Sequence, residues 1–544
     1  MSATAKIILN MNSLTKKISS MIFGGFIEHV GECIHNGIWT YDTSRIPLID
    51  HPDLDNVRRD IMHALVSLRP SVIRWPGGCY ADVYHWKDGI GKRGQRQIVK
   101  NKYWKTWGDR LVDDLARVPG KRFEFEGARE FSERIGYDVQ NQFGTFEFLS
   151  LCEELMALPY ITVNYGSGTP KEAADWVEYC NGSPSTEYGR LRANHGRRPP
   201  FNVPFWGIGN EIYLENEPGY EKDPANYGVR YQEFAESMKD KDSSIKLIGC
   251  GWNQNNWNEG FLAEVDEDYI DYLSIHQYLP FPPNLNQLVE THHPESERIY
   301  YAMMSAPFEI KKQILKAWNS IVKRFGARPR TKVAFDEWGI WYTIRDLVKT
   351  NYNLQDGLFA ALVLMLFQRF SDICSIGLWS TLVNSLGMIR TDDEGLVLTP
   401  VYHVFQIFKE HTYLNLVENL TIETDQFDAD GYGQIGRVSG NPVIESSATI
   451  SDDGSKISLL MVNKHFSDSI DVDLNIKGFV FFRVGEIIEL SADSPFTYNS
   501  IDDRDAVSIT ERSIDDVNAE MSLTLKPHSI TILKLTKLDL GLGI

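Results

Sequence analysis

The chain has 544 residues, of which 42% are hydrophobic and 24% are charged, and its formal net charge is −19. These proportions exclude a mostly disordered, collagen-like or coiled-coil protein. A strongly acidic surface repels phosphate backbones, which argues against nucleic acid but is compatible with a neutral ligand such as a sugar. The longest uninterrupted apolar run, 358–367, is about half as long as a membrane span, so we expect no membrane partner.

The cysteines and the N-terminal residues bear on the cellular compartment. The six cysteines form no CxxC pair and show no even spacing, which indicates reduced thiols in a cytoplasmic protein. Lys16 and Lys17, followed by the apolar stretch 18–27, faintly resemble a signal peptide. No small-residue cleavage site follows that stretch, so we expect a cytoplasmic location.

Short apolar segments, often β-branched, recur through the first 380 residues, and most are followed by a helix-like stretch. Apolar strands that alternate with helices are typical of a parallel sheet buried on both faces. Eight such units predict an α/β fold, a (β/α)8 TIM barrel over residues 18–411 that a helix over 401–411 closes. The expected strands are 21–29, 71–78, 159–167, 205–211, 245–251, 272–278, 332–338 and 373–380.

Two further regions complete the predicted organisation. Residues 88–140, between the second and third strands, are rich in Lys, Arg, Trp and Phe, and we expect a loop region over the barrel mouth. Beyond residue 411, apolar and polar residues alternate between turn-forming clusters, which predicts an additional C-terminal antiparallel β-sandwich over 412–544. A strand at 6–10, within the N-terminal residues 1–17, could join it. The expected sandwich strands are 432–438, 443–449, 456–463, 470–475, 483–490, 519–525 and 529–536.

Two carboxylates stand at predicted strand ends in aromatic surroundings. Glu211 ends the fourth strand and Glu337 ends the seventh, 126 residues further along the chain. Catalytic groups of such barrels lie at the C-terminal ends of the strands, so these carboxylates can face one substrate. Such a pair suits cleavage of a glycosidic bond, where one group protonates the leaving oxygen and the other attacks or activates water. Either glutamate alone could instead cap a helix or pair with an arginine.

Motifs spread over residues 24–384 carry a resemblance to a known family. The chain resembles glycoside hydrolase family 51, the α-L-arabinofuranosidases, and the motifs occur in the family's order. They are Gly25-Phe-Ile-Glu-His29, Arg74-Trp-Pro-Gly-Gly78, Tyr84-His-Trp-Lys-Asp-Gly-Ile-Gly91, Asn141-Gln-Phe-Gly-Thr145, Trp176-Val-Glu-Tyr-Cys-Asn-Gly182, Trp206-Gly-Ile-Gly-Asn-Glu211, His276-Gln-Tyr278, Asp336-Glu-Trp-Gly-Ile-Trp341 and Leu382-Val-Asn384.

The resemblance implies a retaining, exo-acting α-L-arabinofuranosidase that hydrolyses terminal non-reducing arabinofuranosyl residues of arabino-oligosaccharides or arabinoxylan fragments by double displacement. Glu211 would be the general acid/base and Glu337 the nucleophile. The implied substrate-binding set is Glu28, Asn210 and Tyr278 on the furanose hydroxyls, Arg74 orienting a catalytic carboxylate, and Trp341 walling the sugar subsite. The resemblance also implies a homo-oligomer, often a hexamer, and this chemistry requires no cofactor and no metal.

Two positions depart from the family pattern, and both border the sugar pocket. Cys79 stands where the family usually has Asn, and Thr381 stands where many members have Gln. Cys is a weak hydrogen bonder and Thr reaches less far than Gln, so sugar recognition could differ. For His276, a neutral imidazole that orients a carboxylate and a direct substrate contact remain equally open. Alternatives for the whole protein are the same mechanism on a β-D-galactofuranoside, a β-xyloside or an endo-β-glucan, or a silent carbohydrate-binding protein.

Overall fold

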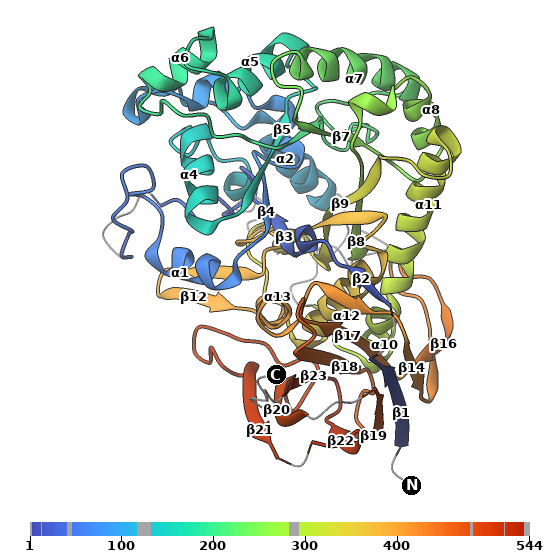
Figure 1. Cartoon of the computed structure of the whole chain (residues 1–544). Coiled ribbons are helices and arrows are strands. Elements are labelled where there is room, and N and C mark those ends of the chain that lie inside the picture. Colours follow the sequence, from blue (N-terminus) through green and yellow to red (C-terminus); the bar gives the residue numbers. More distant parts are fainter. Residues whose placement is uncertain are drawn as a thin grey trace, which may run out of the picture.

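Eight parallel strands close into a barrel in the computed structural model of this chain (Figure 1). The structure describes residues 3–11, 14–40, 46–116, 132–281, 293–478, 482–515 and 517–537. Each of the eight predicted segments overlaps one barrel strand, which confirms the predicted fold class. In chain order the strands are β3 (Gly24–Phe26), β4 (Val72–Trp75), β5 (Leu158–Val163), β6 (Phe205–Ile208), β7 (Lys246–Cys250), β8 (Tyr272–Pro280), β9 (Lys332–Trp341) and β10 (Cys374–Ser380).

Helices surround the barrel, and several begin at a proline. Pro170, Pro224, Pro307 and Pro400 each occupy the start of a helix, where the missing N–H is no loss. The predicted closing helix is confirmed as α13. The helices that follow the strands are α1 (Arg59–Leu68), α4 (Thr145–Leu155), α5 (Pro170–Asn181), α6 (Glu187–Asn194), α7 (Pro224–Lys239), α8 (Trp257–Ala263), α10 (Glu297–Ser305), α11 (Pro307–Phe325), α12 (Leu354–Phe370) and α13 (Pro400–His411).

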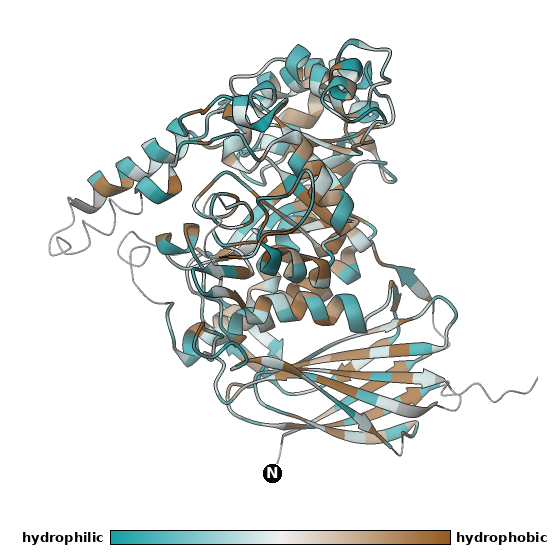
Figure 2. Cartoon of the chain, turned by 90° about the vertical axis from the view of Figure 1, so that its left-hand side faces the viewer, coloured by the Kyte–Doolittle hydropathy of each residue, from teal (hydrophilic) through white to brown (hydrophobic). Residues whose placement is uncertain are grey.

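Two sheets form a sandwich below the barrel, and hydrophilic and hydrophobic residues are interleaved along many of their strands (Figure 2). The larger sheet has the order β2 (Thr15–Lys17), β13 (Asn415–Val417), β17 (Ile444–Ile450), β18 (Lys456–Asn463), β23 (Ser529–Lys537), β20 (Phe482–Ser491) and β21 (Ser508–Ile514). The smaller sheet has the order β14 (Leu420–Glu423), β1 (Ala3–Asn10), β19 (Ile470–Lys477) and β22 (Glu520–Leu525). The N-terminal strand joins the smaller sheet, where it runs parallel to β19, so the sandwich is not wholly antiparallel.

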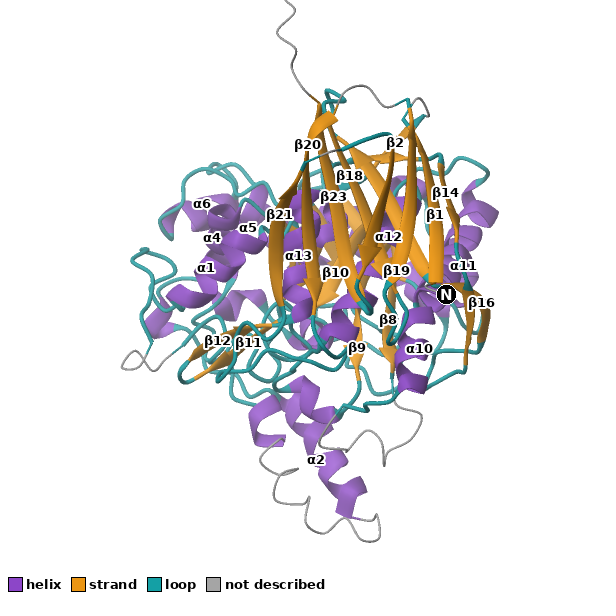
Figure 3. Ribbon diagram, turned by 90° about the horizontal axis from the view of Figure 1, so that it is seen from below, coloured by secondary structure: helices purple, strands orange, loops and turns teal. Residues whose placement is uncertain are grey.

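Helix α12 explains the longest apolar run in the sequence. It lies between the barrel and the larger sheet, where it contacts β10 on one side and β17, β18 and β23 on the other (Figure 3). The run 358–367 is therefore buried all round the helix, as expected for a helix covered on every side. Among the described residues, no helix is long and apolar enough to cross a membrane.

The structure corrects the sequence prediction in several places. Residues 432–438 are mostly a turn, in which Tyr432 pairs with Ile435, and two short strands flank them: β15 (Gln426–Ala429) and β16 (Val438–Pro442). Edge strand β21 was missed because its exposed polar residues give no alternation. The pair β11 (Ile389–Asp392) and β12 (Gly395–Leu398) was also missed.

The segment 88–140 is not simply a loop. It contains helix α2 (Lys102–Ala116), although the loop prediction was correct that the segment reaches the barrel mouth. Tyr103, Trp104 and Trp107 on α2 all line the pocket at that mouth. Residues 117–131 of this segment lie outside the described residues.

Candidate active site

The C-terminal ends of the barrel strands open into a pocket of about 440 Å³. Most of its lining comes from residues at or just beyond the ends of β3, β4, β6, β8, β9 and β10, and α2 adds one wall. Of the predicted site residues, the pocket lining includes Glu28, Cys79, Glu211, His276, Tyr278, Glu337, Trp341 and Thr381. Arg74 and Asn210 lie behind this lining and are both 1% exposed.

A β-bulge gives β9 two adjacent inward carboxylates. The pairing of β9 with β8 shifts by one residue between Ala334 and Glu337, and its pairing with β10 shifts at the same place. In a regular strand, Asp336 and Glu337 would point to opposite faces. The extra residue reorients one of them, so both contact the buried Arg74.

Glu337 is held by a donor on each carboxylate oxygen. Arg74 Nη1 donates to Oε1 at 2.7 Å, and the Tyr278 hydroxyl donates to Oε2 at 2.6 Å. Burial raises the pKa of this carboxyl above its ordinary value, whereas the charges of His276 and Arg74 lower the pKa. The two donors fix the orientation of the carboxylate and favour its charged form.

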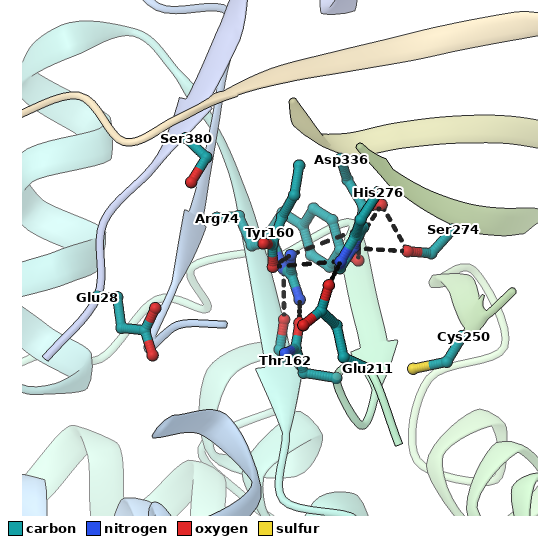
Figure 4. Close-up of polar contacts among 12 residues, drawn as sticks. Glu28, Arg74, Tyr160, Thr162, Glu211, Cys250, Ser274, His276, Asp336 and Ser380 are labelled. Carbon is teal, nitrogen blue, oxygen red and sulfur yellow. Dashed lines mark hydrogen bonds and ion pairs between the residues drawn. The ribbon is translucent and has the colours of Figure 1, made fainter. Parts of the chain in front are cut away.

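His276 is the hub of the charged network in Figure 4. Its Nδ1 lies 2.9 Å from Glu211 Oε1, and its Nε2 lies 3.4 Å from Asp336 Oδ1. Burial opposes a charge on the ring, but the surrounding carboxylates outweigh burial and raise the pKa of His276 to about 10. The ring is therefore an imidazolium at neutral pH that donates from both nitrogens. The sequence left two roles open for His276, a neutral imidazole that orients a carboxylate and a direct substrate contact. Its contacts fit the orientation of a carboxylate, but by a charged imidazole and not a neutral one.

Glu211 follows β6 in a left-handed backbone conformation with φ of +43°. Its side chain is 17% exposed, against 5% for Glu337, so it is the more open of the two carboxylates. One carboxylate oxygen of Glu211, one of Glu337 and a ring nitrogen of His276 all lie within 4.8 Å of one another. The two predicted catalytic glutamates therefore lie side by side in the pocket.

Asn210 and Arg74 form a buried support beneath the two glutamates. Arg74 Nη2 donates to Asn210 Oδ1 at 2.7 Å, and Arg74 Nε donates to Thr162 Oγ1 at 3.0 Å. The backbone N–H of Asn210 donates to the buried Asp82 at 2.9 Å. The amide Nδ2 of Asn210 is buried and has no partner among the described residues, so it is a free donor for a ligand oxygen.

Glu28 lies on another side of the pocket, apart from this network (Figure 4). It accepts hydrogen bonds from the Tyr80 backbone N–H at 2.8 Å and from Trp104 Nε1 at 3.3 Å. A Cβ atom at Gly78 would come within 2.2 Å of Glu28 Oε2, so the glycine leaves room for this carboxyl group. Burial raises the pKa of Glu28 to about 8.

The remaining predicted residues differ in how they face the pocket. Trp341 packs edge-on against Tyr278, with 5.8 Å between ring centroids, and so forms a wall. Cys79 is half-buried at the pocket surface. The Thr381 hydroxyl lies 3.0–3.3 Å from three carbonyl oxygens of its own turn, so its bonding capacity is used inside the loop.

Several residues in and behind the pocket escape the sequence reasoning. The network-forming Asp336 stands beside Glu337, but only the bulge brings both inward. The aromatic residues of α2 recur at helical spacing, a signal that could have identified this wall. The loop residues offer no periodic signal. The residues in question are Asp82, Tyr103, Trp104, Trp107, Tyr213, Glu217, Trp252 and Asp336.

Among the residues that the structure describes, two groups of side chains lie close enough together to be metal ligands. One consists of Glu211, His276 and Glu337, but a charged imidazole has no lone pair to offer a metal. The other consists of Cys79, Glu211 and Glu217, where burial and nearby carboxylates hold the pKa of the Cys79 thiol well above its usual range. Both groups therefore hold protons at neutral pH that a metal would have to displace.

Comparisons with known proteins agree with this site and fold. Residues 64–295 match the model of the α-L-arabinofuranosidase 1 domain, and residues 336–529 match that of the α-L-arabinofuranosidase C-terminal domain. The chain is 29% identical to an "Intracellular exo-alpha-L-arabinofuranosidase" of Bacteroides ovatus, over 98% of this chain and 96% of that protein. It is 28% identical to "Alpha-L-arabinofuranosidase C" of Emericella nidulans, over 95% of each.

Solved structures extend the agreement to three dimensions. A family 51 α-L-arabinofuranosidase of Thermotoga petrophila superposes with a TM-score of 0.84 and 31% identity, over 98% of this chain and all of that one. The arabinose complex of the Thermotoga maritima α-L-arabinofuranosidase also gives a TM-score of 0.84, with 32% identity over the same shares. This chain therefore belongs to glycoside hydrolase family 51, the family of α-L-arabinofuranosidases.

Proposed function

We propose that this α-L-arabinofuranosidase is exo-acting and retaining, and that it releases terminal non-reducing arabinofuranosyl residues by double displacement. One observation carries the mechanism: carboxylate oxygens of Glu211 and Glu337 lie within 4.8 Å of each other. Retaining enzymes hold the two carboxyl groups about 5–5.5 Å apart, whereas inverting enzymes leave about 6.5–9.5 Å for a water molecule. The close approach of these oxygens supports direct attack by a carboxylate.

In the first step, Glu337 attacks the anomeric carbon while Glu211 donates its proton to the leaving oxygen. Arg74 and Tyr278 keep the Glu337 carboxylate aimed and charged before it attacks. The charged His276 donates to Glu211 Oε1, a bond that strengthens as Glu211 loses its proton. In the second step, Glu211 takes a proton from water, which attacks the glycosyl–Glu337 ester and frees the sugar.

The pocket offers polar groups and an aromatic wall that suit a sugar, and the family of this chain supports a furanose as that sugar. Asn210 offers an unpartnered amide donor beside the two glutamates, and Glu28 offers a carboxyl group across the pocket. Trp341 supplies an aromatic wall. We propose arabino-oligosaccharides or arabinoxylan fragments as substrates, in line with the exo activity in the name of the Bacteroides ovatus relative.

Initial rates on matched aryl glycosides test the substrate. The panel contains the α-L-arabinofuranoside, β-D-galactofuranoside, β-D-xyloside and β-D-glucoside, together with a soluble β-glucan, and Glu337→Ala serves as the blank. We expect the arabinofuranoside to exceed every other substrate by at least about tenfold in kcat/KM, or about 1.4 kcal/mol of transition-state preference. Dominant turnover of another glycoside would overturn the assignment of substrate.

Transfer to methanol tests the stereochemistry. A retaining enzyme forms the methyl α-L-arabinofuranoside from an α-linked donor, which the anomeric proton reports in an NMR spectrum. The β-anomer as the first product would contradict double displacement.

Domain organisation, cellular location and oligomeric state complete the proposal. We propose that residues 18–411 form the catalytic unit, that 412–544 together with 1–17 form its companion, and that the enzyme is cytoplasmic and homo-oligomeric. The intracellular relative supports the location. Light scattering across a concentration series tests the oligomeric state, and a constant monomer mass of 62.1 kDa would refute it.

A further inference from the structure

Glu217 is a pocket carboxyl group that the mechanism above does not use. It lies in the loop between β6 and α7, where two successive turns return the chain toward Glu211: Leu214 N–H bonds to Glu211 O at 2.9 Å, and Glu217 N–H bonds to Leu214 O at 3.0 Å. The residue is only 6% exposed, yet it belongs to the pocket lining. Its side chain is therefore buried against the cavity and not in bulk solvent.

The two oxygens of Glu217 have different surroundings. Oε1 accepts a hydrogen bond of 2.7 Å from the Tyr103 hydroxyl on α2. Oε2 is buried and has no hydrogen-bond partner among the residues that the structure describes. Buried polar atoms are nearly always partnered in folded proteins, so an unpartnered oxygen at a ligand cavity points to a partner on the ligand.

The neighbours of Glu217 decide which kind of partner it needs. One oxygen of Glu217, one oxygen of Glu211 and the Cys79 sulfur all lie within 4.8 Å of one another. Burial and the nearby carboxylates of Glu211 and Asp82 hold the pKa of Glu217 well above its ordinary range. Tyr103 already occupies Oε1, so Oε2 is the oxygen left to exchange a hydrogen bond with a bound ligand.

We propose that Glu217 is a specificity-determining residue of this enzyme, whose carboxyl group makes a hydrogen bond through Oε2 with one hydroxyl group of the bound sugar. The inference rests on the proposed function for the identity of that sugar. It assigns to helix α2 a part in recognition, because Tyr103 on α2 holds the carboxyl group through Oε1 and leaves Oε2 for the sugar. Trp104 on the same helix holds Glu28 in a similar way.

Substrates that lack single hydroxyl groups test the contact. The experiment compares wild type, Glu217→Ala and Glu217→Gln on an aryl α-L-arabinofuranoside and its 2-, 3- and 5-deoxy analogues. For the parent substrate, Glu217→Ala should lower kcat/KM by about 10- to 100-fold, the range expected when a buried hydrogen bond is lost. One deoxy analogue should react equally with wild type and Glu217→Ala, because the partner hydroxyl is already missing. Glu217→Gln keeps a hydrogen-bonding group at this place and should stay within about threefold of wild type on the parent.

Equal losses on the parent and on all three analogues would overturn the proposal, since a merely structural role would not distinguish the hydroxyls. An unchanged kcat/KM in Glu217→Ala would overturn it as well. Thermal unfolding of each variant shows whether it folds, and Glu217→Gln decides the question if the alanine variant does not. A wrong substrate assignment would give another result, because the wild-type enzyme would then prefer another glycoside. The deoxy analogues of that glycoside would test the same contact.

Discussion

The barrel mouth and the layer around α12 are both buried, yet they are built from opposite kinds of side chain. At the mouth, Arg74 and His276 lie among the carboxylates of Glu211, Asp336 and Glu337. Around α12, aliphatic and aromatic residues fill the space between the barrel and the larger sheet. At the mouth, burial shifts the pKa values of the ionisable side chains. Around α12, burial contributes hydrophobic free energy to folding.

The two regions differ in what their buried side chains depend on. Buried charges persist at the mouth because almost every one has a specific partner, and removing a partner leaves a charge that burial disfavours. The layer around α12 depends instead on complete packing. Substitutions at the mouth should therefore affect catalytic turnover more than the free energy of unfolding. Substitutions around α12 should affect the free energy of unfolding more than turnover.

Glu337→Ala gives the largest expected effect. Loss of the attacking carboxylate should lower kcat by about 10⁴-fold or more, as removal of a covalent nucleophile typically does. Steady-state kinetics measures the loss, and circular dichroism should show an unchanged fold. Retention of wild-type turnover would rule out Glu337 as the nucleophile.

Glu211→Ala should depend on the leaving group. With an unactivated oligosaccharide, loss of the proton donor should lower kcat/KM by about 10²–10⁴-fold. With a dinitrophenyl arabinofuranoside, the leaving oxygen needs little protonation, so the loss should be much smaller. A series of aryl leaving groups measures this difference, and an equal loss across the series would argue against an acid role.

Leu364→Ala tests the packed layer around α12. Leu364 is fully buried in α12, so the shortened side chain should lower the free energy of unfolding by about 2–5 kcal/mol. Denaturant unfolding measures this cost, and kcat should stay near its wild-type value. The matched control is Leu315→Ala on the outer surface of α11, where 36% of the residue is exposed and the cost should be well below that at Leu364.

The pH dependence of stability probes the charged side chains of the barrel mouth. The pKa of His276 rises from 6.5 to about 10 on folding, so the folded state binds its proton more tightly. The resulting stabilisation is complete below about pH 6.5 and is lost as the pH rises through about 10. Glu28, with a pKa raised by burial to about 8, acts in the same direction.

Melting temperatures of wild type and His276→Gln between pH 6 and 10 measure the contribution of this histidine. The gap between the two proteins should narrow as the pH rises. A gap that stays constant over this range would show that proton binding by His276 does not stabilise the fold.

Strand β18 and strand β19 show why parts of the fold can be inferred from sequence. β19 alternates buried and exposed residues because one face meets solvent. β18 is apolar almost throughout because Leu460 and Val462 face the α12 layer while Leu459 and Met461 face the sandwich interior. Both patterns identify strands. The turn at 432–438 misled the same reasoning, because contacts with distant segments fix its conformation: Gln434 N–H bonds to Pro280 O, and Ile435 is buried in the main hydrophobic core.

The sequence by itself determined the eight barrel strands, the sandwich that follows them and the two glutamates at strand ends, because periodicity and local motifs encode these features. Only the tertiary structure decided how the site is charged and which side chains are left unpartnered. The bulge at Asp336, the imidazolium of His276 and the free oxygen of Glu217 all depend on atoms from segments that lie far apart along the chain. Hydrogen bonding and desolvation act through space, so no local pattern in the sequence records them.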